Sequence, residues 1–171
     1  MLTEVQRRGG IGRGPVEAAI DHALAYVAAL PVQPGVLVDL GSGGGLPGLV
    51  IAAAAPDWQL HLVERRSKRA DLLRYGVSVL KMGERVEVHG QDVARFVPAH
   101  GGEADVVTAR SFAPPLVVVR TARPLVRVGG AILISDPPDG RARWTTADLV
   151  PLGLVDDGAA GGIRRVRVSA V

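Results

Sequence analysis

The residues with the clearest chemical potential are glycines that follow a short apolar run. The run Val36–Leu40 is followed by Gly41, Gly43 and Gly45, in a G-x-G-x-G spacing. Gly43, Gly45 and Gly48 also fit G-x-G-x-x-G, the fingerprint of dinucleotide sites. Glycine lets a backbone curl beneath a nucleoside without a clash from a Cβ atom. The segment therefore predicts a nucleoside-binding turn, with two classes of cofactor open.

An acid two residues before the first glycine separates these two classes. Asp39 would repel a pyrophosphate bound at the turn. The amino-acid portion of S-adenosylmethionine carries an ammonium group, which a carboxylate attracts directly or through water. A dehydrogenase also needs a substrate domain, and 171 residues leave little room for one. We therefore expect S-adenosylmethionine as the cofactor, with Asp39 serving its methionine portion.

Two further acids follow the next two predicted strands. Glu64 closes the second strand, about 20–25 residues beyond the loop, the separation at which an acid reaches ribose hydroxyls. Its structural alternative is a surface charge among basic residues. Asp92 follows the third strand, where we expect it to accept a hydrogen bond from an adenine amino group. Its structural alternative is the N-cap of the next helix.

Apolar periodicity predicts strands that alternate with helices along the chain. The expected strands are 36–40, 59–63, 85–89, 104–108, 131–135 and 163–168. The expected helices are 16–30, 46–55, 67–82 (capped by Ser67), 92–96, 116–126 and 144–152, with a turn at Gly129 and Gly130. This alternation favours an α/β fold, a doubly wound and mostly parallel sheet with helices on both faces, as in Rossmann-like class I methyltransferases.

Composition limits the remaining possibilities. The chain has 20 Lys and Arg against 17 Asp and Glu, 47% hydrophobic residues and no cysteine. No disulfide, thiolate metal site or cysteine nucleophile is therefore possible, and we expect no metal. No apolar run reaches the roughly 20 residues that cross a bilayer, so we expect a cytoplasmic monomer without membrane contact. The Gly- and Arg-rich residues 1–15 are expected to form a loose basic arm, followed by one methyltransferase domain over 16–171.

The stretch from His22 to Asp136 resembles the glucose-inhibited division protein B family, the 16S ribosomal RNA guanine-N7 methyltransferases. The resemblance rests on residues 39–48, which end in a distinctive Leu-Pro-Gly, and on residues 67–69 and 108–113. His22 matches a family histidine. The resemblance implies an S-adenosylmethionine-dependent enzyme whose partner is ribosomal RNA or the small ribosomal subunit.

The same resemblance implies particular cofactor contacts. These are expected at Gly41 and Leu46, at the backbone of Asp92 and Val93, and at Arg110.

Chemistry narrows the methyl acceptor. Methylation of a pyrimidine C5 in nucleic acid ordinarily needs a cysteine adduct, which this chain cannot form. Guanine N7 already has an in-plane lone pair and no proton, so its methylation needs no general base. Catalysis would rest on alignment of the reactants. We assign catalytic roles to Phe112, stacked on a flipped base, and to Arg110, which orients the cofactor or a phosphate.

Two departures from the family pattern keep alternative functions open. Only residues 1–15 precede the helix that carries His22, where the family has a helical extension. Asp136 stands where the family usually has a Lys-Gly pair. The alternatives are a paralogous methyltransferase that acts on a small molecule or protein, and a cofactor-binding protein without rRNA activity. The basic cluster of Arg65, Arg66, Lys68, Arg69 and Arg74 fits either an RNA path or a solvated helix face.

Overall fold

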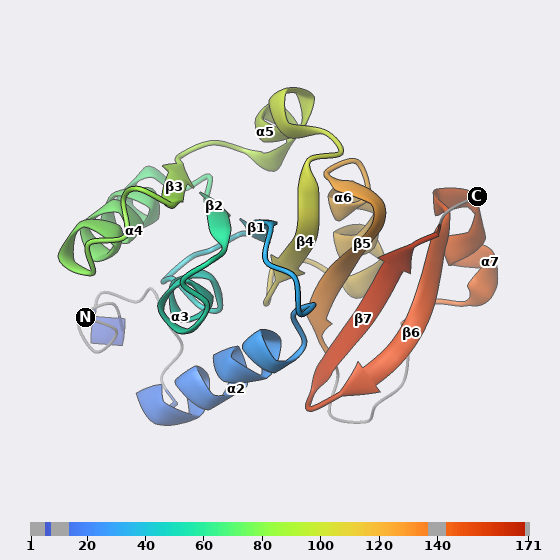
Figure 1. Ribbon diagram of the computed structural model, residues 1–171, viewed down its shortest axis with the longest axis horizontal. Helices are drawn as coiled ribbons and strands as arrows, with labels where there is room; N and C mark the ends of the chain where they lie inside the picture. The colour runs from blue at the N-terminus through green and yellow to red at the C-terminus, as the bar shows by residue number, and fades with distance from the viewer. Residues whose placement is uncertain (1–5, 8–13, 137–142, 170–171) are drawn as a thin grey trace.

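A seven-stranded sheet in the order β3-β2-β1-β4-β5-β7-β6 organises the protein (Figure 1). The computed structural model describes residues 6–7, 14–136 and 143–169. The strands are β1 Val36–Leu40, β2 Gln59–Val63, β3 Val86–His89, β4 Ala104–Ala109, β5 Val126–Ser135, β6 Leu154–Ala160 and β7 Ile163–Val168. Neighbours from β3 to β5 pair in parallel, whereas β7 pairs antiparallel with both β5 and β6. The predicted doubly wound, mostly parallel fold is confirmed.

Helices cover both faces of this sheet. One face carries α2 Val16–Ala28, α3 Gly48–Ala54 and α4 Ser67–Val79. The other face carries α5 Val93–His100, α6 Pro115–Ala122, α7 Thr146–Leu149 and the short 3-10 helix η1 Val150–Leu152. No helix in the described part of the chain is long and apolar enough to cross a membrane.

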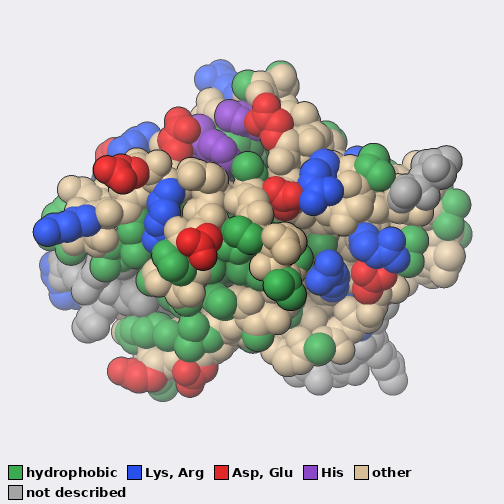
Figure 2. Space-filling view, in the orientation of Figure 1, with side chains coloured by type: hydrophobic (Ala, Val, Ile, Leu, Met, Phe, Trp, Pro, Cys, Tyr) green, Lys and Arg blue, Asp and Glu red, His purple; other side chains and the backbone are tan. Residues whose placement is uncertain are grey.

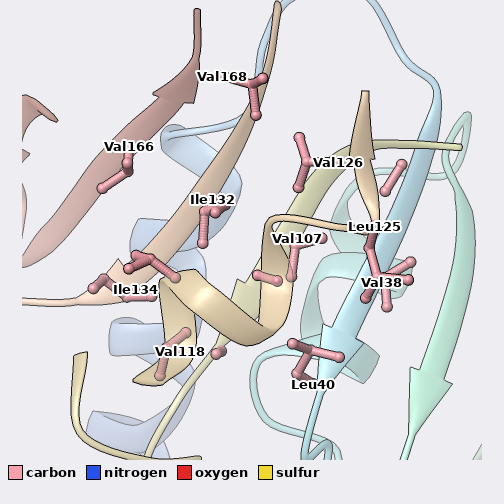
Figure 3. Close-up of a cluster of buried hydrophobic side chains, with 14 of the residues drawn as sticks. Val38, Leu40, Val107, Val118, Leu125, Val126, Ile132, Ile134, Val166 and Val168 are labelled. Atoms are coloured by element: carbon pink, nitrogen blue, oxygen red, sulfur yellow. The ribbon is translucent and has the colours of Figure 1, made fainter. Parts of the chain in front are cut away.

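Each face has its own apolar core, because alternate residues of a strand point to opposite faces. In β1, Leu37 packs beneath α2, α3 and α4, whereas Val38 packs beneath α5 and α6. Figure 3 shows the second of these cores, which includes Val38, Leu40, Val107, Leu125, Ile132 and Ile134. Strands buried on both faces read as continuous apolar runs, which is why their positions were predictable from the sequence.

The strand order reverses between β1 and β4. From β1 the chain moves outward to β2 and β3, and it then returns to place β4 on the other side of β1. In such folds the ligand crevice lies at this reversal, beyond the carboxyl ends of the strands. The segments that directly follow β1, β2, β3 and β4 are therefore brought together at one edge.

Several predicted boundaries shift, and one strand was missed. The predicted helix 46–55 begins only at Gly48, because residues 41–47 form turns. The predicted Ser67 cap is wrong: Arg66 holds the N-cap position and no side chain caps α4. The predicted helix 116–126 ends at Ala122, and the predicted turn at Gly129 and Gly130 lies within β5, where the β4–β5 register shifts.

The missed strand is β6. Its sequence, Leu-Val-Asp-Asp-Gly-Ala-Ala, contains residue types that are depleted in strands. Antiparallel pairing with β7 supplies the partner that makes this segment extended. The predicted N-terminal arm falls mostly on residues 1–5 and 8–13, which lie outside the described residues.

Candidate functional site

A cleft of about 290 Å³ opens at the reversal of strand order. Every segment that follows one of the first four strands contributes to its wall. The lining residues are Gly41, Val63, Glu64, Arg65, Arg66, Arg69, Gln91, Asp92, Val93, Ser111 and Phe112. Five residues predicted for the site, namely Gly41, Glu64, Asp92, Val93 and Phe112, are therefore brought together.

The glycine loop after β1 is tied to the end of β2. The backbone N–H groups of Gly41 and Ser42 both donate to the Val63 carbonyl, at 2.9 and 3.1 Å. Gly41 has φ +67°, and a Cβ atom there would lie 2.7 Å from Cδ2 of Phe112. Any larger residue would be strained in this conformation and would crowd that ring. Glycine is therefore required where the loop meets the cleft.

Glu64 is the polar anchor of this loop. The residue is only 5% exposed, and Oε2 accepts a hydrogen bond from the N–H of Gly43 at 3.0 Å. Oε1 accepts a second hydrogen bond from the N–H of Arg66 at 2.8 Å. The alternative interpretation of Glu64 as a surface charge is therefore wrong. Its contact with ribose hydroxyls stays a prediction, and each oxygen keeps a second lone pair for it.

Asp39 lies beneath the loop instead of lining the cleft. Its Oδ1 accepts a hydrogen bond from Oγ1 of Thr108 at 2.7 Å, and the residue is fully buried. Its other oxygen, Oδ2, has no hydrogen-bond partner of normal geometry among the described residues, although the backbone of Gly48 lies close to the carboxyl group. Burial raises the pKa of Asp39 to about 6, against the opposing hydrogen bond from Thr108. A buried carboxylate with an unsatisfied oxygen favours a nearby positive charge or donor.

Asp92 is the N-cap of α5. Its Oδ1 accepts a hydrogen bond from the N–H of Ala94 at 3.0 Å. The structural alternative considered for Asp92 is thus confirmed, and this cap holds Asp92 and Val93 at the cleft wall. The contact with adenine stays a prediction.

The two residues assigned to catalysis diverge after β4. Ser111 between them has φ +54°, a left-handed conformation that is uncommon outside glycine. Phe112 lines the cleft, where its ring packs against Gly41. Arg110 instead reaches α2, where its Nη1 donates to the carbonyl of Ala19 at 3.3 Å. Beyond the end of β4, Arg110 therefore contacts α2, whereas Phe112 forms part of the cleft wall.

Near Arg110 lies a second polar group, in which Tyr26 and Ser135, two residues not predicted for the site, join His22. The Oη of Tyr26 donates to the Ala109 carbonyl at 2.9 Å and lies 2.8 Å from Oγ of Ser135. Nε2 of His22 lies 3.0 Å from the same Ser135 oxygen. Burial, and secondly the charge of Arg110, lowers the pKa of His22. The four-residue spacing of His22 and Tyr26 on one helix face was the signal for this pair.

Other predicted site residues also lie outside the cleft wall. Leu46 is buried with Ala19 and Ala23 of α2 and does not line the cleft, so its contact with the cofactor stays a prediction. Gly43 and Gly45 shape the loop from below, with φ of +54° and +93°. Gln91 and Ser111 line the cleft, although no site role was predicted for them. Arg65, Arg66 and Arg69 were predicted only as members of the basic cluster, yet all three line the cleft.

Asp136, the departure from the family pattern, is engaged in an ion pair. Its Oδ1 accepts from Nε of Arg164 at 2.7 Å, and Nη1 of Arg164 also contacts Oδ2 of Asp156 at 3.0 Å. Arg164 is 8% exposed. The acid thus helps to join β5, β7 and β6, and its charge is offset within the sheet.

Solved structures share this fold. An S-adenosylmethionine-dependent methyltransferase from Aquifex aeolicus matches with a TM-score of 0.70 at 10% identity, over 98% of both chains. An S-adenosylmethionine-dependent O-methyltransferase from Thermotoga maritima matches with a TM-score of 0.64 at 17% identity, over 87% of this chain and 65% of that one. At these identities the likeness concerns the fold alone.

Proteins with higher sequence identity to this chain are rRNA methyltransferases by name. A protein named ribosomal RNA small subunit methyltransferase G from Nitrobacter hamburgensis is 38% identical over 122 residues, which are 70% of this chain and 46% of that protein. The protein of the same name from Rubrobacter xylanophilus is 34% identical over 137 residues, 76% of this chain and 52% of that protein. The chain therefore spans about half the length of these relatives.

The model of one protein family matches more than half of the chain. It matches residues 20–136, from α2 through the end of β5, and so includes the glycine loop, Glu64, Asp92 and the Arg110–Phe112 turn. The chain therefore belongs to the GidB family, rRNA small subunit methyltransferase G.

Proposed function

We propose that this chain binds S-adenosylmethionine in the cleft and transfers its methyl group to guanine N7 of small-subunit ribosomal RNA. The observation that carries the proposal is the anchored glycine loop. In a chain of the GidB family, Glu64 fastens Gly43 at the edge where a doubly wound sheet takes its ligand. The matching family model spans this segment.

The residues present fit this cofactor. Gly41 lines the cleft with main-chain atoms alone, so a ligand can approach its backbone closely. Glu64 offers acceptors for ribose hydroxyls, and Asp92 and Val93 offer groups for the adenine at the opposite wall. The unsatisfied Oδ2 of Asp39 lies directly below Gly48, since a Cβ there would be 2.6 Å from that oxygen. Its negative charge suits an ammonium group above the loop.

Bound there, S-adenosylmethionine supplies an electrophilic methyl group on a positively charged sulfur. The chain's own work is positioning. Guanine N7 needs no proton removed, so a site without a general base is sufficient. Holding two reactants in line is worth effective molarities of about 10⁵ M or more. The rigid loop, fixed at Gly41 by Val63 and at Gly43 by Glu64, provides that alignment.

The substrate side is assigned to the end of β4. Phe112 presents a ring at the cleft for stacking on a base taken out of the RNA, a contact worth about 1–3 kcal/mol. Arg110, held by the Ala19 carbonyl, orients the cofactor or a phosphate from the α2 side. The exposed Arg65 and Arg66 at the cleft rim add positive charge along the RNA approach.

One observation favours a second candidate, a paralogue with a small-molecule or protein acceptor. The position after β5 carries Asp136 instead of the expected cation, and its partner Arg164 belongs to the sheet. That edge is therefore less positive than an RNA entrance requires. This candidate keeps the same cofactor cleft and differs only in the acceptor.

A transfer assay tests the proposal. The chain is incubated with S-adenosylmethionine labelled on its methyl group and with small ribosomal subunits from a strain that lacks this family's enzyme. We expect label in the RNA at an N7-methylguanine, mapped by chain cleavage. Subunits that already carry the modification are the matched control and should take up none. Label in a protein or metabolite pool with none in the RNA would support the paralogue.

Cofactor binding is measured separately by calorimetry with S-adenosylmethionine and, as a comparison, NAD. Binding without transfer to any pool would identify a cofactor-binding protein. The proposed substrate implies a cytoplasmic site of action. We also propose that residues 16–171 act as one domain and that the chain is a monomer, which light scattering checks.

A further inference from the structure

Three of the four histidines of the chain gather on the sheet face that α5 covers. His61 of β2 pairs in register with Glu87 of β3, and His89 lies two residues beyond Glu87 on the same face. Nδ1 of His61 lies 2.9 Å from Nε2 of His89. Oε2 of Glu87 lies 3.7 Å from each of these nitrogens. Figure 2 shows histidine side chains at the surface near β3 and α5, with acidic side chains close by.

The distances among these three atoms fit one metal ion. With metal–ligand bonds of about 2.0–2.1 Å, ligand atoms at the corners of a tetrahedron are about 3.3 Å apart. The observed separations of 2.9, 3.7 and 3.7 Å lie on either side of that value. All three ligand atoms lie within 4.8 Å of one another. Side-chain shifts of about 0.4 Å are enough to reach the bound geometry.

The chemistry of the donors selects the class of ion. Two imidazole nitrogens and one carboxylate oxygen suit Zn²⁺ and its first-row neighbours, whereas Mg²⁺ and Ca²⁺ prefer oxygen alone. The Glu87 side chain is 67% exposed and those of His61 and His89 are 20% and 11% exposed, so an ion can enter from solvent.

A third histidine and a second acid complete the surroundings. The ring of His100, at the end of α5, lies 5.1 Å from that of His61 and 5.4 Å from that of His89. His100 stacks on Phe96, and its Nδ1 lies 3.2 Å from Oε2 of Glu103. Carboxylates that hydrogen-bond an imidazole are common around metal sites, where they fix the orientation of the ring.

We propose that His61, Glu87 and His89 form a binding site for a divalent transition-metal ion of the Zn²⁺ class. The site is distinct from the cofactor cleft, whose lining includes none of these residues. No metal was expected from the sequence, on the absence of cysteine. The pairing of β2 with β3 brings His61 and His89 together.

The test uses the untagged full chain, stripped of metal by a chelator and titrated with ZnCl₂ in a calorimeter, without S-adenosylmethionine. We expect one equivalent to bind with a dissociation constant in the micromolar range or below, and MgCl₂ to give no signal. A Co²⁺ titration should give the intense visible absorption of a four-coordinate ion. Because no cofactor is present, failure of the methyltransferase proposal leaves this result unaffected.

Matched variants locate the ion. Glu87→Gln at an exposed position should fold normally and weaken Zn²⁺ binding at least tenfold, and His89→Gln should do the same. Glu84→Gln changes an exposed acid three residues away and should leave the affinity unchanged.

Two results would overturn the site. One is the absence of Zn²⁺ binding below a dissociation constant of 1 mM, which would leave the two rings as a plain hydrogen-bonded pair. The other is stoichiometric binding that Glu87→Gln and His89→Gln leave as tight as before.

Discussion

Thr108 donates a 2.7 Å hydrogen bond from Oγ1 to Oδ1 of Asp39, and this bond joins the ends of β4 and β1. The two residues are register partners in the parallel pair. The bond holds a fully buried carboxylate below the glycine loop and leaves its second oxygen unsatisfied among the described residues. An ionised group in this position costs stability in the free protein and favours a cationic ligand. Removal of the negative charge of Asp39 should therefore raise the stability of the free chain and weaken cofactor binding.

Asp39→Asn should stabilise the free chain and weaken cofactor binding. The folded-state pKa of Asp39 is raised to about 6 from 3.8, so the folded chain keeps a proton that the unfolded chain has released. The contribution of Asp39 to the free energy of unfolding therefore falls as pH rises from about 4 to 6 and is level above that. The Asp39→Asn variant should lack this decline, so its free energy of unfolding at pH 8 should exceed that of the natural chain by about 1–3 kcal/mol.

Urea unfolding of both proteins at pH 5 and pH 8 measures this difference, and Asp57→Asn at an exposed position serves as control. Calorimetry should show S-adenosylmethionine bound at least tenfold more weakly by the Asp39→Asn variant, and binding by the natural chain should weaken below pH 6. An identical pH slope in both proteins would contradict the raised pKa.

Glu64→Gln should not be a mild change. Both carboxylate oxygens accept backbone N–H groups, from Gly43 and Arg66, and an amide has only one oxygen to offer. One N–H group would face the amide nitrogen, at a cost of about 1–3 kcal/mol. Thermal or urea unfolding measures that loss, and Glu17→Gln, an exposed acid in α2, is the comparison. Unchanged stability would show that the loop does not depend on this anchor.

Gly41→Ala should distort the cleft through Phe112. The residue has φ +67° and its new Cβ would lie 2.7 Å from the ring carbon Cδ2. We expect a loss of about 1–3 kcal/mol in stability together with weaker cofactor binding, since strain and crowding add. Gly83→Ala is the control, because nothing lies within 4 Å of a Cβ there.

A double-mutant cycle with Phe112→Ala separates the two causes. Removing the ring should relieve the crowding and leave the cost of the left-handed backbone. Additive losses in the double variant would mean that Gly41 and Phe112 do not contact each other in solution.

His22 should titrate below its ordinary pKa of 6.5. Burial is the larger cause and the charge of Arg110 the smaller, so Arg110→Gln should raise the pKa of His22 only part of the way back. NMR of the imidazole protons follows the titration, with Arg120→Gln in α6 as a control that should have no effect. A His22 pKa at or above 6.5 in the unaltered chain would argue against its packing beside Ser135.

Much of the fold was readable in the sequence because parallel strands buried on both faces leave a strong local signal. The bounds predicted for β1 and β2, Val36–Leu40 and Gln59–Val63, are those observed. β1 is a mostly apolar run followed by Gly41, whereas β2 has three apolar residues among its five and is followed by the acid Glu64. The glycine loop, with Glu64 and Asp92 after the next two strands, was likewise readable, since a strand end fixes where the following residue lies.

Tertiary structure decided everything that depends on which elements become neighbours. β6 is a strand because β7 pairs with it, despite two aspartates and a glycine in its sequence. Arg110 and Phe112, two residues apart, face different elements because Ser111 adopts a left-handed conformation between them. His61 and His89 meet only through the register of β2 with β3. Local sequence carries propensity and burial pattern, whereas register and crossover connections come from packing across the whole sheet.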